Sequence, residues 1–166
     1  KSWDIFEKYN INTQNVEIAD GKTFSWGGIY NEDYSKRDTL FTELGVFENF
    51  IPIINSNIKQ PILYLGNIQP QLQLDVINKV KNPYLIAADS MNLWINLFPK
   101  KVWELISKVN VFMLNDEEAI QLTNKSNLES IADDFLNFGP QIVIIKMGGE
   151  GALVAYGNKK VYVSVV

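Results

Sequence analysis

The sequence of 166 residues contains no cysteine and no histidine. Without cysteine there are no disulfides, thiolate zinc sites or cysteine nucleophiles, and without histidine the commonest general base and metal ligand is missing. No apolar run approaches the roughly 20 residues that span a bilayer, and the first residues lack the pattern of a secretory signal. The default expectation is therefore a cytoplasmic protein without a membrane partner.

Positive charge is also scarce, since the formal net charge is -4 and the pI is about 4.9. A chain of this kind has no broad basic field, so we expect no nucleic-acid partner. A phosphate ligand would need local lysines, helix N-termini or a divalent cation. The hydrophobic share of 46% and charged share of 20% are ordinary for a globular chain, and a single domain is the natural expectation at this length.

The part of the chain from about Val16 to Leu44 has strand-like patterning. The pair Asp20-Gly21 lies between two such runs and predicts a hairpin. The expected strands are Val16–Ala19, Lys22–Tyr30 and Asp38–Leu44. In the second of them the period of two places Phe24, Trp26, Gly28 and Tyr30 on one face. This aromatic stripe either packs a small sheet or contacts a ligand or a second subunit.

From Pro61 onward, strands alternate with helices. This alternation predicts a mainly parallel sheet with right-handed crossovers and flanking helices, which is an α/β fold. The expected strands include 62–65, 84–88, one starting at 111, and 142–146; the expected helices are about 70–80, 98–108, 116–123 and 128–138. The chain ends with a predicted β-hairpin, 151–156 and 160–165, that turns at Gly157-Asn158.

Polar residues follow three of these strands. Asn115 and Glu118 are three residues apart at a helix start, which is the spacing of an N-cap and its reciprocal carboxylate. The same two side chains could organise magnesium and phosphate, and the two interpretations are compatible. Asp89 and Asn92 follow another strand, where a cap or turn role is the simpler interpretation.

The third group is Lys146, Gly148 and Gly151, which form the pattern Lys-x-Gly-x-x-Gly after a strand. A backbone without side chains can approach an anion closely while the lysine neutralises it. The simpler alternative is a solvated lysine followed by a turn. By itself this motif is weak.

The ordered combination of these motifs resembles the ribokinase-like, or PfkB, family of carbohydrate and nucleoside kinases. The likeness runs from about Leu63 to Val165 and extends to a lid segment of one sugar-kinase branch. Its matching stretches are Ala88–Ile95, Leu114–Ala119 with Leu122-Thr123, Val143–Ala152 and Gly21–Tyr30.

The resemblance implies ATP and Mg²⁺ as cofactors and a sugar-like substrate. It assigns Asn115, Lys146, Gly148 and Gly151 to the nucleotide and Glu118 to the metal. The region of about residues 12–45 becomes a β lid, which is often also a homodimer contact, and about 61–166 becomes the nucleotide-binding core of one incomplete kinase domain. The residues expected at the substrate and lid are Phe24, Trp26, Tyr30, Asp89 and Asn92.

Two departures from the family pattern matter. The family's Gly-Ala-Gly-Asp-like motif with its catalytic base should follow Val166, and its opening strand should precede Lys1, so the sequence is interpreted as an internal fragment with no catalytic base of its own. Leu93 and Trp94 stand where many relatives have an arginine. We therefore expect the 166-residue chain alone to be inactive.

Three hypotheses remain. The favoured one is a sugar kinase that transfers the γ-phosphoryl group of ATP to a hydroxyl. A nucleoside kinase would share nearly every feature. A catalytically silent nucleotide-binding or assembly module would keep the fold and lack the acidic base.

Overall fold

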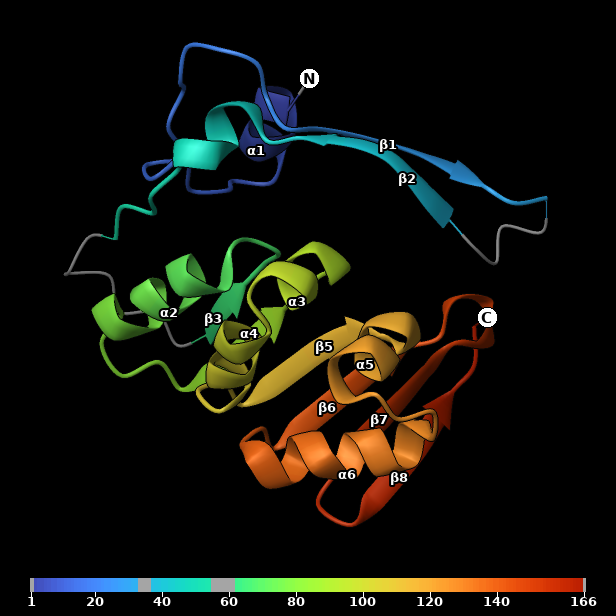
Figure 1. The fold of residues 1–166 in the computed structure, drawn as a ribbon. Helices are drawn as coiled ribbons and strands as arrows, with labels where there is room; N and C mark the ends of the chain where they lie inside the picture. The colour runs from blue at the N-terminus through green and yellow to red at the C-terminus, as the bar shows by residue number, and fades with distance from the viewer. Residues whose placement is uncertain (1, 33–36, 55–61, 166) are drawn as a thin grey trace. The chain divides into compact units, whose positions relative to one another are not determined.

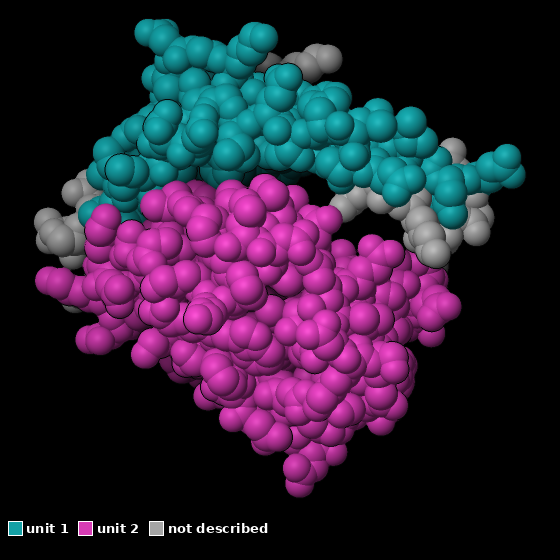
Figure 2. Space-filling model, viewed as in Figure 1, with its two compact units in different colours: residues 1–54 teal, residues 55–166 magenta. Residues whose placement is uncertain are grey.

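The structure is a computed structural model that describes residues 2–32, 37–54 and 62–165 (Figure 1). The chain divides into two compact units, residues 1–54 and residues 55–166, which Figure 2 distinguishes by colour. Among the described residues, none of the helices combines the length and apolarity needed to cross a membrane.

The second unit contains a six-stranded sheet in the order β3-β4-β5-β6-β7-β8. The first four strands are mutually parallel, and β7 and β8 add to one edge as an antiparallel hairpin. The predicted α/β fold is therefore confirmed. The strands are β3 (Ile62–Leu65), β4 (Leu85–Asp89), β5 (Val111–Asn115), β6 (Ile142–Lys146), β7 (Ala152–Tyr156) and β8 (Lys159–Val163).

The helices of this unit begin at local signals in the sequence. Pro70 and Pro99 occupy the first turns of their helices, where a missing N–H costs nothing, and Asn127 caps the last helix by accepting from the backbone N–H of Ser130 at 2.8 Å. The helices are α2 (Pro70–Lys79), α3 (Asn92–Leu97), α4 (Pro99–Ile106), α5 (Asp116–Thr123) and α6 (Leu128–Phe138), with the 3-10 turn η2 at Gly148–Glu150.

The short helix α3 was not predicted. Its N-cap is Met91, so Asn92 is the first helical residue and its side chain accepts from the N–H of Leu93 at 2.9 Å. Burial of Trp94 and Ile95 supplies the stabilisation that a helix of this length lacks by itself.

The core of this unit lies between the sheet and its helices. Strand order follows chain order from β3 to β6, and right-handed crossovers then place the connecting helices on one face (Figure 1). The sheet residues on that face are fully buried, namely Phe112, Leu114, Val143, Ile145, Leu153 and Ala155. Their neighbours along the strands, including Val111, Met113, Ile144 and Val154, remain half-buried.

The first unit contains α1 (Ser2–Lys8), the antiparallel pair β1 (Ser25–Tyr30) and β2 (Arg37–Glu43), and the 3-10 turn η1 (Gly45–Asn49). The Asp20-Gly21 hairpin is wrong, because residues 16–19 form no strand and Ile18 is 83% exposed. The chain before β1 instead meets the segment after β2, where the N–H of Val46 donates to the carbonyl of Lys22 at 2.9 Å. Asp20-Gly21 is a turn signal, but residues 16–19 before it form no strand that could complete a hairpin.

The glycines of β1 allow two aromatic rings to lie against the backbone. A Cβ on Gly28 would come within 2.4 Å of the Trp26 ring, and one on Gly27 within 2.3 Å of the Phe41 ring. None of the described side chains in this unit is fully buried. A two-stranded sheet without a core of its own is marginal in water, so these strands depend on packing beyond their own pairing.

Candidate functional site

The last residues of three neighbouring parallel strands meet at the carboxyl edge of the sheet. Asn115 is paired in register with Lys146, while Asp89 is paired with Met113, two residues before Asn115. Since side chains two residues apart on a strand share a face, Asp89, Asn115 and Lys146 emerge on the same face. The carboxyl edge of an open α/β sheet is where ligands bind.

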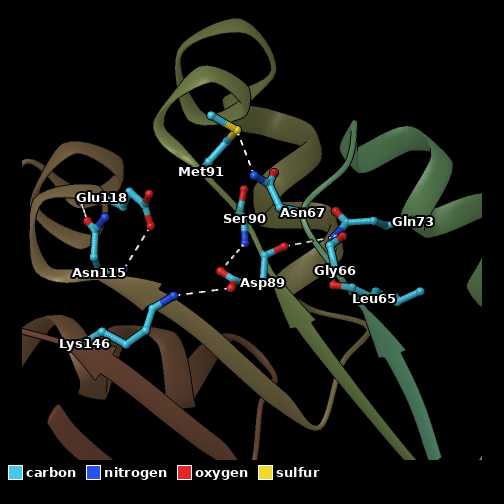
Figure 3. A network of polar contacts seen from close by, with 10 residues as sticks. All are labelled: Leu65, Gly66, Asn67, Gln73, Asp89, Ser90, Met91, Asn115, Glu118 and Lys146. Atoms are coloured by element: carbon cyan, nitrogen blue, oxygen red, sulfur yellow. Dashed lines mark hydrogen bonds and ion pairs between the residues drawn. The ribbon is translucent and has the colours of Figure 1, made fainter. Parts of the chain in front are cut away.

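Lys146 and Asp89 contact each other directly although they are far apart in the sequence. The Lys146 Nζ atom lies 3.3 Å from Asp89 Oδ2, and the other carboxylate oxygen accepts from the N–H of Ser90 at 2.8 Å (Figure 3). The lysine side chain is 49% exposed and the aspartate 20%. A pair so open to water contributes at most about 1 kcal/mol to stability, so the lysine remains available to an anion.

Asn115 and Glu118 form the predicted capping box at the start of α5. The N–H of Glu118 donates to Asn115 Oδ1 at 2.7 Å, and the N–H of Asn115 donates to Glu118 Oε2 at 2.9 Å (Figure 3). The capping interpretation is therefore confirmed. It leaves Glu118 Oε1 without a role in the cap, so a further function of the carboxylate is geometrically open.

Glu118 is a buried carboxylate, only 6% exposed. Burial raises its pKa above the ordinary value, against the lowering effect of the Asn115 N–H and of the Lys146 charge; the negative charge of Asp89 raises it further, and the Asn92 N–H lowers it. The four groups named here are thus electrostatically coupled to one carboxyl. A cation placed beside Glu118 would favour its ionised form.

The glycine turn after β6 has two different kinds of glycine. Gly151 has φ +100°, and a Cβ there would lie 1.9 Å from the carbonyl oxygen of Val163, so β8 requires a glycine at this position. Gly148 has φ +56°, and a Cβ there would meet no atom within 4 Å. The backbone of Gly148 is therefore accessible to a ligand. At Gly151 the contact with β8 by itself explains why the residue is a glycine.

Among the described residues, no cluster of three or more acidic side chains is arranged to hold a metal ion. The carboxylates at the sheet edge that could contribute to one are Glu118 and Asp89. Magnesium commonly uses one or two carboxylates and completes its shell with waters and substrate phosphates. This pair of carboxylates therefore fits magnesium that arrives with a nucleotide and keeps waters in its shell.

A buried amide that no sequence motif indicated donates to the backbone at this edge. Gln73 on α2 is 1% exposed, and its Nε2 lies within hydrogen-bonding distance of the carbonyls of Leu65, Gly66 and Asp89 (Figure 3). The sequence carried a signal, because Pro70, Gln73 and Leu74 have the spacing of a buried helix stripe. A polar residue within such a stripe calls for a buried partner.

The predicted lid residues belong to the other unit. Phe24 packs edge to face on Phe47 with ring centroids 6.1 Å apart, and Trp26 Nε1 donates to Thr39 Oγ1 at 3.4 Å. Phe24 and Tyr30 are 40% and 48% exposed. The unit thus presents aromatic surface, and its use for a substrate stays a prediction.

Two solved kinases have the same arrangement of strands and helices. The nucleoside kinase of Methanocaldococcus jannaschii superposes with a TM-score of 0.71 at 19% identity, covering 98% of this chain and 53% of that one. The fructokinase of Vibrio cholerae, solved with fructose, ADP and a calcium ion bound, gives 0.68 at 17% identity, covering 98% and 57%. Together with the polar carboxyl edge, these likenesses place the chain in the class of ribokinase-like α/β folds.

The family model described as pfkB family carbohydrate kinase matches residues 61–166. The chain belongs to this family. A cytidine kinase of Thermococcus kodakarensis is 26% identical over 153 residues, an alignment that covers 89% of this chain and 54% of the relative. The chain thus spans about half the length of this curated relative.

Proposed function

We propose that the protein carrying this chain transfers the γ-phosphoryl group of ATP to a hydroxyl of a carbohydrate-like acceptor. The observation that carries the proposal is the meeting of Lys146, Asp89 and the Asn115–Glu118 capping box at one sheet edge. Phosphoryl transfer depends chiefly on positioning and charge stabilisation. A lysine and a coupled buried carboxylate are the groups that this chain offers for both tasks.

In this proposal the residues of the phosphate side have separate tasks. Lys146 supplies positive charge to the nucleotide phosphates, and the open backbone at Gly148 lets them approach closely. Asn115 orients a phosphate and fixes the start of α5, while Glu118 holds magnesium directly or through water. When bound, magnesium would neutralise phosphate charge. Gly151 stays a proposed part of the nucleotide site through the turn that it shapes.

The acceptor side is proposed to include Asp89 and Asn92, together with Phe24, Trp26 and Tyr30 of the lid. The Asn92 N–H and the Asp89 charge both act on Glu118, so the acceptor-side and phosphate-side groups adjoin each other within the second unit. A transfer reaction needs this adjacency, because the acceptor oxygen and the phosphorus must come within about 3–3.5 Å. The general base is proposed to come from outside this chain.

The experiment is an acceptor panel on the complete protein, with ADP formation as the readout. Lys146→Met should raise the KM for ATP about tenfold or more, because a charged hydrogen bond to phosphate is worth about 1.5–3 kcal/mol. Lys125→Met is a matched control, since Lys125 also forms an ion pair, with Asp134, and lies outside the site. Its side chain is 47% exposed, close to the 49% of Lys146. This substitution should leave the KM within about twofold.

Magnesium-independent or absent ADP formation with every acceptor would contradict the proposal and favour a silent nucleotide-binding or assembly module. Equal effects of the two lysine substitutions would remove Lys146 from the nucleotide site. In that case the strand-end motifs would be only caps and turns.

A second candidate is a nucleoside acceptor in place of a free sugar. The cytidine kinase relative favours it, because its alignment covers 89% of this chain. Both acceptors offer a sugar hydroxyl, so the phosphate side would be unchanged. The same panel decides between them by kcat/KM for free pentoses and hexoses against cytidine and other nucleosides.

A further inference from the structure

A polar side chain outside the proposed phosphate and acceptor sites is sealed behind the sheet edge. Gln73 faces inward from α2 (Pro70–Lys79), between the core residues Pro70 and Leu74, with 1% of its surface exposed. Burying an amide is unfavourable unless it is hydrogen-bonded. The packing of α2 does not explain why this residue is a glutamine, because an apolar side chain would be buried there at lower cost.

The amide faces the carboxyl ends of two strands at once. Nε2 lies 3.2 Å from the carbonyl of Leu65, the last residue of β3, and 3.0 Å from the carbonyl of Gly66, which follows it. It also lies 2.9 Å from the carbonyl of Asp89, which ends β4 (Figure 3). Two N–H bonds are thus shared among three acceptors. Where the ladder between parallel strands stops, these carbonyls need other donors, and Gln73 supplies them.

Only the donor end of this amide is used. Gln73 Oε1 is buried without a hydrogen-bond partner among the described residues, whereas Nε2 is shared by three carbonyls. The orientation of the amide is fixed, because reversing it would direct Oε1 at three carbonyl oxygens. The side chain thus acts as a donor that joins the end of β3 to Asp89.

The Asp89 end of this link leads into the proposed site. The same residue whose carbonyl accepts from Gln73 carries the carboxylate that contacts Lys146 at 3.3 Å, and its negative charge raises the pKa of Glu118. A shift of the Asp89 backbone would displace that carboxylate from both neighbours. Few other contacts hold the carboxylate of Asp89 in place, since it accepts only from Ser90 and Lys146 in the described structure.

We propose that Gln73 is a positioning residue that fixes Asp89, and through it Lys146, for nucleotide phosphate. The inference rests on the proposed function. Gln73 itself touches no substrate, so its loss acts through the placement of Asp89 and Lys146. Groups that orient a metal-ligating side chain in this indirect way change metal affinity about 10–100-fold when they are removed, and a smaller effect is expected for an exposed ion pair.

The test is Gln73→Met in the complete protein, which keeps length and removes the donor. Its KM for magnesium-ATP should rise about threefold to fivefold, because the Lys146–Asp89 contact that it positions is worth at most about 1 kcal/mol, with kcat changed less than about twofold. Gln71→Met is the chemical control, because Gln71 lies on the same helix and its Nε2 donates to Asp75 at 2.9 Å, away from the strand ends. Leu74→Ala is the stability control, because Leu74 is 4% exposed beside Gln73.

Both controls should keep the KM for magnesium-ATP within about twofold, although Leu74→Ala lowers the melting temperature at least as much as Gln73→Met. Hydrogen exchange should quicken at residues 62–67 and 86–92 in Gln73→Met, and more evenly over the unit in Leu74→Ala. An unchanged KM in Gln73→Met, or an equal rise in Leu74→Ala, would overturn the positioning role alone. Wild-type protein without magnesium-dependent ATP binding would refute the proposed function, and the positioning role with it.

Discussion

Glu118 combines two demands that act on its charge in opposite directions. Burial raises its pKa above the usual 4.5, whereas the N–H of Asn115, from which its oxygen accepts in the capping box, favours the ionised form. The folded state therefore holds the proton more tightly than the unfolded state does. This contribution to stability is fully present below pH 4.5 and is lost as the pH rises through the raised pKa of the folded state.

The substitution Glu118→Gln should remove this pH dependence, because the amide oxygen can still accept from Asn115 and carries no titrating proton. The free energy of unfolding of the wild type, relative to the variant, should fall as the pH rises from about 4.5 and then level off. Denaturant unfolding of both proteins without nucleotide measures this difference. A stability difference that is constant with pH, or that grows as the pH rises, would contradict the raised pKa of Glu118.

The same variant separates the cap from the proposed metal role. If Glu118 holds magnesium, the variant should bind ATP about tenfold more weakly when magnesium is present, with little change when it is absent. A loss of stability with unchanged magnesium-dependent affinity would leave Glu118 as a cap alone.

Among the elements, the turn from β6 into β7 gives the sharpest contrast between neighbouring positions. Gly151→Ala should destabilise the fold by about 2–4 kcal/mol, because the new methyl group would collide with the Val163 carbonyl at a φ of +100°. Gly149→Ala is the matched control, since a Cβ there meets no atom within 4 Å. It should change stability by less than about 0.5 kcal/mol.

Thermal or denaturant unfolding of the two glycine variants checks this expectation. Equal stability of both would mean that β8 does not pack against the turn as described. A large loss in the Gly149 variant would point instead to a buried contact on the open side of the turn.

At the scale of the whole molecule, apolar surface remains open in both units. In the second unit the helices lie on one face of the sheet, while Val111, Ile144 and Val154 on the other face are half-buried. Parallel sheets are normally covered on both faces. In the first unit, Ile29 and Leu40 on the paired strands are 59% and 62% exposed. Exposed apolar patches of this kind mark contact surfaces.

We expect the β lid to form a homodimer contact in the complete protein. Leu40→Lys should weaken self-association at least about tenfold, because it places a charge within an apolar contact. Tyr84→Lys is the control, since Tyr84 is 87% exposed in the second unit. Sedimentation velocity over a range of concentrations measures both. A wild-type protein that stays monomeric, or equal weakening by both substitutions, would exclude this contact.

Features that depend on residues close together in the sequence could be predicted, and features that depend on distant residues could not. The α5 cap needed two residues three apart. Apart from α3, the strands and helices from residue 62 onward followed from the local alternation of strand and helix patterns. The Asp20-Gly21 hairpin was wrong because a turn signal is local, whereas a strand forms only when it pairs with another. In the structure β1 pairs with β2 and not with residues 16–19. Helix α3 was missed because burial of Trp94 and Ile95 stabilises it.

Periodicity, caps and composition are properties of neighbouring residues, so an α/β chain with polar residues after its strands and without cysteine or histidine chemistry could be predicted from the sequence alone. The contact of Lys146 with Asp89, which lies 57 positions earlier, and the link from β3 to that aspartate through Gln73 emerged from the folded chain. Those contacts depend on the order and register of strands in the sheet. Strand order and register arise from packing the sheet against its helices, which no short stretch of sequence encodes.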